Sequence, residues 1–140
     1  MSYCTILLIG IALMHILKIK VMQIKTVLLP IVTESFDEAV EFYKKITGKN
    51  VSSSASHDSY KLSLVDRFVI LTAIDDSKAL EIPRLVNAIF VVDNLEEYWK
   101  ILKDEAKRII IPVNKVSTGM RFIVEQPDGK VIEYLQLNES

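Results

Sequence analysis

The sequence is poor in the residues that build metal and disulfide sites, with one cysteine and two histidines in 140 residues. Cys4 has no second cysteine to pair with, so an internal disulfide and a cysteine-based zinc site are excluded. Basic residues are not in excess, because 17 Lys and Arg stand against 18 Asp and Glu. No dense Lys/Arg cluster of the kind that neutralises phosphates occurs, so we expect no nucleic-acid partner. The expected location is the reducing cytoplasm.

Apolar residues are abundant, and they make up half of the chain. A quarter of the residues are charged, and together these fractions are typical of one globular domain with a sizeable core. We expect this domain in residues 22–140, with two modules at about 22–75 and 85–140.

Residues 1–21 stand apart as an apolar extension. The run at residues 4–17 is shorter than a membrane span of about 20 residues, and it lacks the flanks of a signal peptide. Three interpretations stay open. The extension is a start-site artefact upstream of Met22, or a real membrane or partner anchor, or an additional strand or helix that folds back on the domain. A membrane is an expected partner only under the second interpretation.

Apolar periodicity predicts one strand, one helix and three further strands, and this order of elements occurs twice along the chain. Helices are expected at residues 35–47 and 94–107, where Ser35 and Asn94 are candidate N-caps and acidic residues follow in the first turn. Residues 50–59 read as a loop or an exposed edge strand, and residues 75–84 read as a linker. The remaining predicted strands cover residues 24–32, 60–65, 68–73, 86–92, 108–112, 120–125 and 130–137.

The two halves of the sequence can be aligned by their candidate helix N-caps and by the turns before their last strands. Pairing Ser35 with Asn94 places Leu28 opposite Asn87 in the first strands. Pairing Asp66 with Asp128 places Leu71 opposite Glu133 in the last strands.

Three segments resemble the vicinal oxygen chelate superfamily, which includes glyoxalase I, bleomycin-resistance proteins, extradiol dioxygenases and methylmalonyl-CoA epimerase. They are the helix from Phe36 to Gly48, the junction at residues 92–95, and the Pro-Asp-Gly turn that runs from Gln126 into Ile132 and Glu133. The resemblance covers roughly residues 24–137. It implies an α+β fold of two βαβββ modules, which form a curved, mostly antiparallel sheet around a cavity.

The resemblance also implies where a metal would bind in an enzyme of this kind. Carried over to this sequence, the four ligand positions are Leu28, Leu71, Asn87 and Glu133. Only Glu133 is a good ligand for a divalent ion, whereas such an ion needs three or more. We therefore expect no metal and no cofactor.

The neighbouring side chains describe the expected cavity, because side chains alternate along a strand. An apolar pocket is predicted, with Glu133 and Asn87 as its main polar groups. Pairing across the Pro-Asp-Gly turn adds Met120 and Phe122 to the ligand-binding residues, unless that register slips by one residue.

Three functions are compatible with these residues. The first is a metal-independent small-molecule binder like the bleomycin-resistance branch, with a homodimer expected by resemblance. The second is an atypical enzyme that uses Glu133 as a base or as a sole carboxylate ligand. The third is a structural or regulatory module that binds no ligand. Without such a role, Glu133 would be solvated or paired with a nearby base, and Asn87 would satisfy local backbone.

Overall fold

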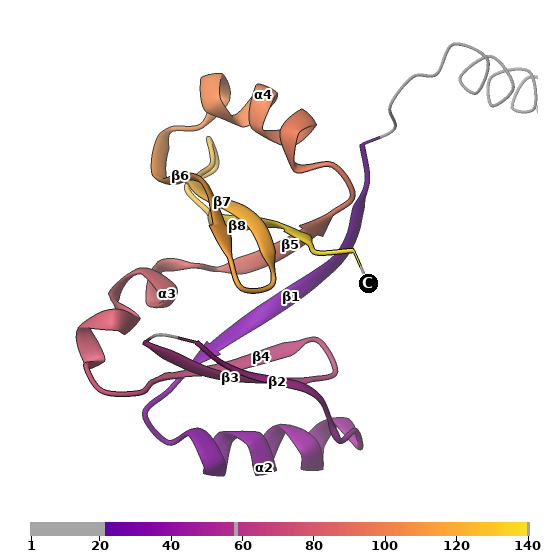
Figure 1. Ribbon diagram of the computed structural model, residues 1–140, viewed down its shortest axis with the longest axis vertical. Coiled ribbons are helices and arrows are strands. Elements are labelled where there is room, and N and C mark those ends of the chain that lie inside the picture. The colour runs from indigo at the N-terminus through magenta and orange to yellow at the C-terminus, as the bar shows by residue number, and fades with distance from the viewer. Residues whose placement is uncertain (1–21, 58, 140) are drawn as a thin grey trace, which may run out of the picture.

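The computed structural model describes residues 22–57 and 59–139. Eight strands form one sheet in the order β2-β3-β4-β1-β5-β8-β7-β6, with helices α2 and α4 on its outer sides (Figure 1). The strands are β1 (Ile24–Val32), β2 (Val51–His57), β3 (Tyr60–Val65), β4 (Phe68–Ala73), β5 (Ala88–Val92), β6 (Arg108–Val116), β7 (Gly119–Glu125) and β8 (Val131–Leu137). The helices are α2 (Phe36–Thr47), η1 (Ser77–Leu80), α3 (Glu81–Leu85) and α4 (Leu95–Glu105).

The sheet is mixed and curls into a half-barrel. Only the β1–β4 and β5–β8 pairs are parallel, and the other five neighbouring pairs are antiparallel. Strand, helix and three strands occur twice along the chain, and the two modules meet where β1 pairs with β5. The predicted α+β fold with a curved, mostly antiparallel sheet is therefore confirmed.

Each long helix covers the outer face of its own module. Val40 of α2 packs with Val65 and Ile70 of the sheet in a first core. On α4, Leu95 packs with Phe122 and Tyr134 in a second core, and Trp99 lies against Phe122 at a ring distance of 5.0 Å. The opposite face of the sheet, which Glu133 shares, is called the inner face below.

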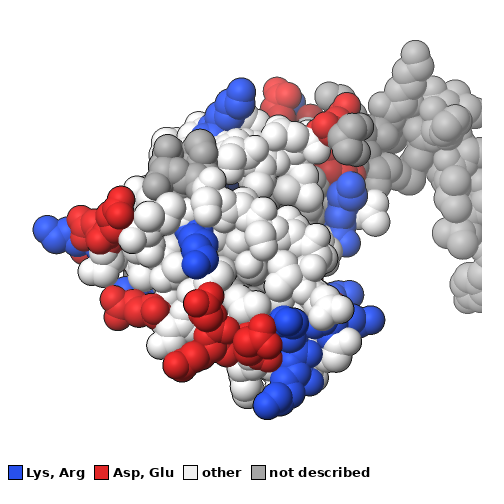
Figure 2. Space-filling model, turned by 60° about the horizontal axis from the view of Figure 1, so that its bottom comes forward, with Lys and Arg blue, Asp and Glu red and all other residues white. Residues whose placement is uncertain are grey.

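Helix α2 carries a charge distribution that suits its dipole. Asp37 and Glu38 lie in the first turn, and Lys44 and Lys45 lie in the last. In Figure 2 acidic side chains gather along the lower edge of the molecule, with basic side chains beside them and a broad, mostly uncharged surface above. The helix ends at Gly48, which adopts the left-handed conformation and donates its backbone N–H to Lys44.

Several expected elements differ in extent from the observed ones. The predicted linker contains two short helices, η1 and α3, and Leu80 of η1 is fully buried. Pro83 is compatible with α3 because it stands in the first turn, where a missing N–H breaks no helical hydrogen bond. Strand β6 continues to Val116, beyond the predicted end at Pro112, and residues 51–57 form the edge strand β2.

The interpretations of residues 1–21 lie outside the described residues. Among the described residues, no helix combines the length and the apolar character that crossing a membrane requires.

Candidate functional site

The inner face around Glu133 is built by β5, β7 and β8. Glu133 pairs with Ile89 of β5 and with Ile123 of β7. Ile89, Ile123 and Leu135 are 7%, 1% and 9% exposed, so little of this apolar wall is open to solvent within one chain. A carboxylate among such neighbours loses hydration and needs a compensating partner.

Arg121 supplies that partner. Its Nη1 donates to Oε1 of Glu133 at 2.9 Å, and the two side chains are 23% and 14% exposed. Arg121 pairs with Leu135 in the neighbouring strand, so it stands on the same face as Glu133 and one row away. The guanidinium offsets the desolvation of the carboxylate, and the pair stays partly accessible to solvent.

A third polar residue extends this site to β6. Asn114 pairs with Arg121 across the β6–β7 ladder. In the described part of the chain, Oδ1 of Asn114 and Nε of Arg121 are both buried without a hydrogen-bond partner. Buried polar atoms in that condition are uncommon in folded proteins. One is an acceptor and the other is a donor, so together they match a polar group that can both donate and accept.

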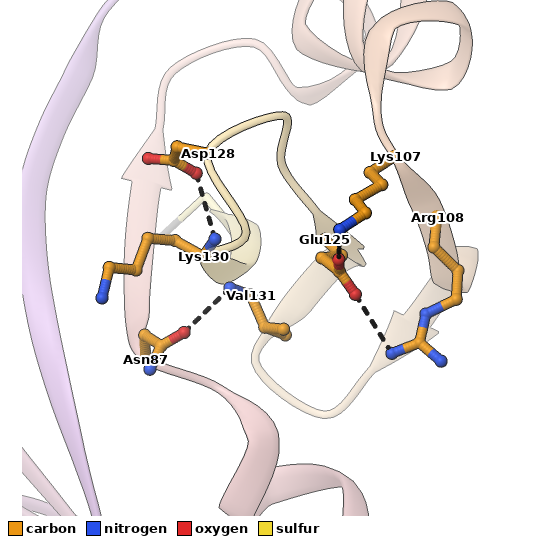
Figure 3. A network of polar contacts seen from close by, with 7 residues as sticks. All are labelled: Asn87, Lys107, Arg108, Glu125, Asp128, Lys130 and Val131. Carbon is orange, nitrogen blue, oxygen red and sulfur yellow. Dashed lines mark hydrogen bonds and ion pairs between the residues drawn. The ribbon is translucent and has the colours of Figure 1, made fainter.

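Asn87 is engaged by the backbone. It lies just before β5, where its Oδ1 accepts the N–H of Val131 at 2.9 Å and its own N–H donates to the carbonyl of Val131 (Figure 3). The same figure shows Asp128 accepting the N–H of Lys130 across the Pro-Asp-Gly turn, at 3.0 Å. The side chain of Asn87 therefore connects the residue after this turn, Val131, to the start of β5. This is the local backbone role that the sequence offered as the alternative to ligand binding.

The alignment that selected Leu71 is corrected by the strand register. Leu29 pairs with Phe68 in the first module, and the equivalent residue Ala88 pairs with Ile132 in the second. Phe68 is therefore equivalent to Ile132, and Val69 is equivalent to Glu133. Leu71 lies two residues further along the strand, opposite Val32.

The error came from anchoring the alignment on the turns. The β3–β4 turn has only Asp66 and Arg67 between its strands, whereas the β7–β8 turn runs from Gln126 to Lys130. Pairing Asp66 with Asp128 therefore slipped the last strands by two residues. A shift of two keeps every side chain on the same face.

The residues at the family's ligand positions do not fit a divalent metal ion. Leu28 stands in line with Ile89 and Glu133 across the sheet, but neither it nor Val69 carries a donor atom. The amide oxygen of Asn87 is occupied by the backbone. Within residues 22–57 and 59–139, no three His, Cys, Asp or Glu side chains come together in a way that could hold an ion. We derive no metal chemistry from this site.

Phe122 and Met120 do not share the inner face, so their predicted place beside Glu133 is wrong. Phe122 pairs with Tyr134, and its ring stacks on that of Tyr134 at 4.8 Å in the core under α4. Met120 pairs with Gln136 and is 40% exposed on the α4 side. The register slipped by one residue, which brings Arg121 and Ile123 to the inner face instead.

Arg121 and Asn114 were missed by the sequence reasoning. A charged residue inside the apolar strand Gly119–Glu125 was the available signal, since such a residue needs a partner when its strand is buried. The identity of that partner depends on the register between β7 and β8, which periodicity alone does not fix.

Comparisons with known proteins identify the fold. No protein-family model and no curated protein matches the chain. Among solved structures, it is similar to an uncharacterized protein from Methanosarcina mazei, with a TM-score of 0.73, 25% identity, and coverage of 84% of this chain and 96% of that one. Methylmalonyl-CoA epimerase from Mycobacterium tuberculosis matches with a TM-score of 0.62 and 14% identity, over 79% of this chain and 86% of the epimerase.

A glyoxalase/bleomycin resistance protein/dioxygenase superfamily member from Vibrio splendidus 12B01 matches with a TM-score of 0.52 and 17% identity, over 81% of this chain and 98% of that one. The chain therefore has the fold of the vicinal oxygen chelate superfamily. At sequence identities this low, structural similarity establishes a shared fold and does not establish a shared activity.

Proposed function

We propose that this protein binds a small molecule at the inner face without a metal ion. The observation that carries the proposal is the ion pair of Arg121 and Glu133, which stands partly exposed on an otherwise apolar wall. A few convergent polar groups on apolar walls are the usual composition of a small-molecule site. The matching ligand has an apolar body and one polar group, which reaches the pair and the unpartnered atoms of Arg121 and Asn114.

Metal independence is supported by the ligand positions. Leu28 and Val69 offer no donor atom, Asn87 is occupied, and Glu133 already accepts from a guanidinium. A cation at Glu133 would compete with Arg121 for the same carboxylate. The pairing also weakens the alternative of an enzyme with Glu133 as a base, since a free base would have to leave Arg121 first.

The small-molecule proposal is tested by identifying what accompanies the purified protein. Native mass spectrometry of the full chain, isolated from its own host, is expected to show a small-molecule adduct. The adduct should be lost from the variant Arg121→Met and retained by Glu97→Gln, which removes one partner of the Lys100–Glu97 ion pair on α4. A protein that carries no adduct under any isolation condition would favour the structural or regulatory alternative.

Elemental analysis of the same preparation tests metal independence separately. We expect no stoichiometric Zn, Fe, Mn or Ni. One tightly held ion per chain that disappears in Glu133→Ala would overturn this part of the proposal and leave small-molecule binding intact.

We also propose that the protein is a homodimer. Three apolar side chains of β1, Ile24, Val27 and Leu29, are 42%, 37% and 43% exposed on the outer face. They lie along β1, one of the two middle strands of the sheet, so a second copy could cover the strip symmetrically. Light scattering at micromolar concentration is expected to give the mass of two chains. A monomer mass for the wild type would contradict the dimer, and Leu29→Lys is expected to shift the equilibrium toward monomer.

A further inference from the structure

A groove of about 480 Å³ lies on the α4 side of the sheet, separate from the inner face. Its lining is largely apolar and comes from the first half of α4, from β6, from the start of β7, and from the end of β8 with the two residues that follow it. Met120 and Leu137 are 40% and 50% exposed there, and Trp99 lies beside them. Exposed apolar side chains gathered in one concave place mark a surface that another group covers.

The start of β1 is held at the loop that leads into α4, close to this groove. The carbonyl of Gln23 accepts the N–H of Asp93, and the N–H of Gln23 donates to the carboxylate of Asp93. Asp93 stands two residues before Leu95, which lines the groove. Figure 1 shows the beginning of β1 beside the loop that leads into α4. Chain that precedes Gln23 therefore starts next to the groove.

The segment before this point matches the groove in both character and charge. Residues 4–17 are apolar, and Lys18 and Lys20 follow them. The groove is apolar, and Glu96 and Glu139 stand among its lining residues. Residues 18–22 can span up to about 17 Å in extended form, which is enough to connect β1 to the groove. The segment is thus complementary to the groove, with an apolar run for its apolar side chains and two lysines for its acidic ones.

We propose that the apolar N-terminal segment, residues 4–17, docks in the α4 groove of its own chain. Leu137, Met120 and Trp99 form the contact surface, and Lys18 and Lys20 lie toward Glu96 and Glu139. Docking removes apolar surface of both partners from water, and it covers the most exposed part of β8.

Trp99 makes the proposal measurable, because it is the only tryptophan and it lines the groove. The full chain is compared with the variant Leu8→Asp/Ile11→Asp, which places two charges in the apolar run. Ser2→Asp/Tyr3→Asp adds the same charges outside it as a control. Acrylamide is expected to quench Trp99 more strongly in the first variant than in the unaltered chain, and equally in the control and the unaltered chain.

A double-mutant cycle assigns the contact to the groove. Leu137→Asp is expected to lower the urea midpoint of the unaltered chain by about 0.5–1 M, and to lower that of Leu8→Asp/Ile11→Asp much less. Ile46→Asp, at a 56% exposed position on α2, serves as the matched control and should act equally in both backgrounds.

Three outcomes would overturn the proposal. Equal quenching in the unaltered chain and in Leu8→Asp/Ile11→Asp would show that the segment does not cover Trp99. Protection of Trp99 that grows with protein concentration would assign the groove to a second copy. Protection that persists in Leu8→Asp/Ile11→Asp at every concentration would assign it to a small apolar molecule. None of these outcomes bears on Arg121 or Glu133, so the proposed function is tested independently.

Discussion

The two modules share one topology and build it with different side chains. In the first, three buried residues, Val40, Val65 and Ile70, form the core under α2. In the second, six buried residues form the core between α4 and the sheet, and the ring of Phe122 lies 5.0 Å from that of Trp99 and 4.8 Å from that of Tyr134. A repeated fold thus requires apolar faces in the right places and tolerates different residues on them.

The two modules also place different side chains on the inner face, and this difference bears on function. Glu133 of the second module is equivalent to Val69 of the first, and the partner Arg121 also belongs to the second. The polar part of the candidate site therefore comes from one module, while the other contributes apolar wall. Four experiments probe this asymmetry, beginning with the largest expected effect.

The aromatic core of the second module is expected to dominate stability. Phe122 is fully buried between Trp99 and Tyr134, so Phe122→Ala should lower the free energy of unfolding by about 3–5 kcal/mol. Urea denaturation measures this loss. Met120→Ala, on the same strand but 40% exposed, is the control and should change stability far less. Similar losses for the two variants would show that the second core is not packed around Phe122.

The ion pair is expected to act as a unit. Arg121→Met leaves the carboxylate of Glu133 without its partner and should destabilise the protein by about 1–2 kcal/mol, less than a fully buried pair because both side chains retain some exposure. Arg121→Met/Glu133→Val makes the second module resemble the first, and it should recover most of that loss. Urea midpoints of Arg121→Met, Glu133→Val and the double variant measure the coupling. Additive losses would mean that the two side chains contribute separately.

The local sequence pattern predicted most helices and strands of this fold. It did not predict the features that depend on contacts between distant segments. Strands β1, β3 and β4 were placed at their observed bounds, because turns and alternating apolar residues mark them along the chain. Helices α2 and α4 were placed within two residues of their observed ends. The Pro-Asp-Gly turn was also predicted, and its register was not.

That register determines which side chains share the candidate site. A slip of one residue between β7 and β8 exchanges Phe122 for Arg121 on the inner face. The predicted site therefore contained the correct carboxylate, Glu133, and lacked its partner. Cross-strand contacts of this kind depend on the geometry of a five-residue turn, which apolar periodicity does not record.

Helix capping differs between the modules in a similar way. Neither Ser35 nor Asn94 makes a side-chain cap hydrogen bond, although both stand at N-cap positions. The N–H of Leu95 instead donates to Oε1 of Gln136 on β8, at 2.7 Å. Gln136→Ala should therefore cost about 1 kcal/mol, in the range of a lost cap, while Ser35→Ala should change stability little. Equal effects in urea denaturation would contradict this assignment.

The last contrast concerns a phenol that is buried in the second core, whereas Tyr43, which packs against the first core, is only partly buried. Tyr134 occupies the position of Ile70 in the first module, and its hydroxyl donates to Oε1 of Gln126. Burial raises the pKa of Tyr134 to about 12, with Tyr98 and Asp128 adding smaller contributions. The folded protein therefore holds this proton more tightly than the unfolded chain, whose tyrosines titrate near pH 10.

The consequence for stability is confined to alkaline pH. Below about pH 10 both states are protonated, so the contribution of Tyr134 is fully present, and it is lost as the pH rises through about 12. Burial also raises the pKa of Tyr98, so the phenolate absorbance of the folded protein should show at least one tyrosine fewer titrating near pH 10 than the urea-unfolded chain shows. Tyr134→Phe removes the late-titrating group and should flatten the fall in urea midpoint between about pH 10 and 12. A variant with an unchanged alkaline fall would assign that loss to the tyrosines and lysines elsewhere in the chain.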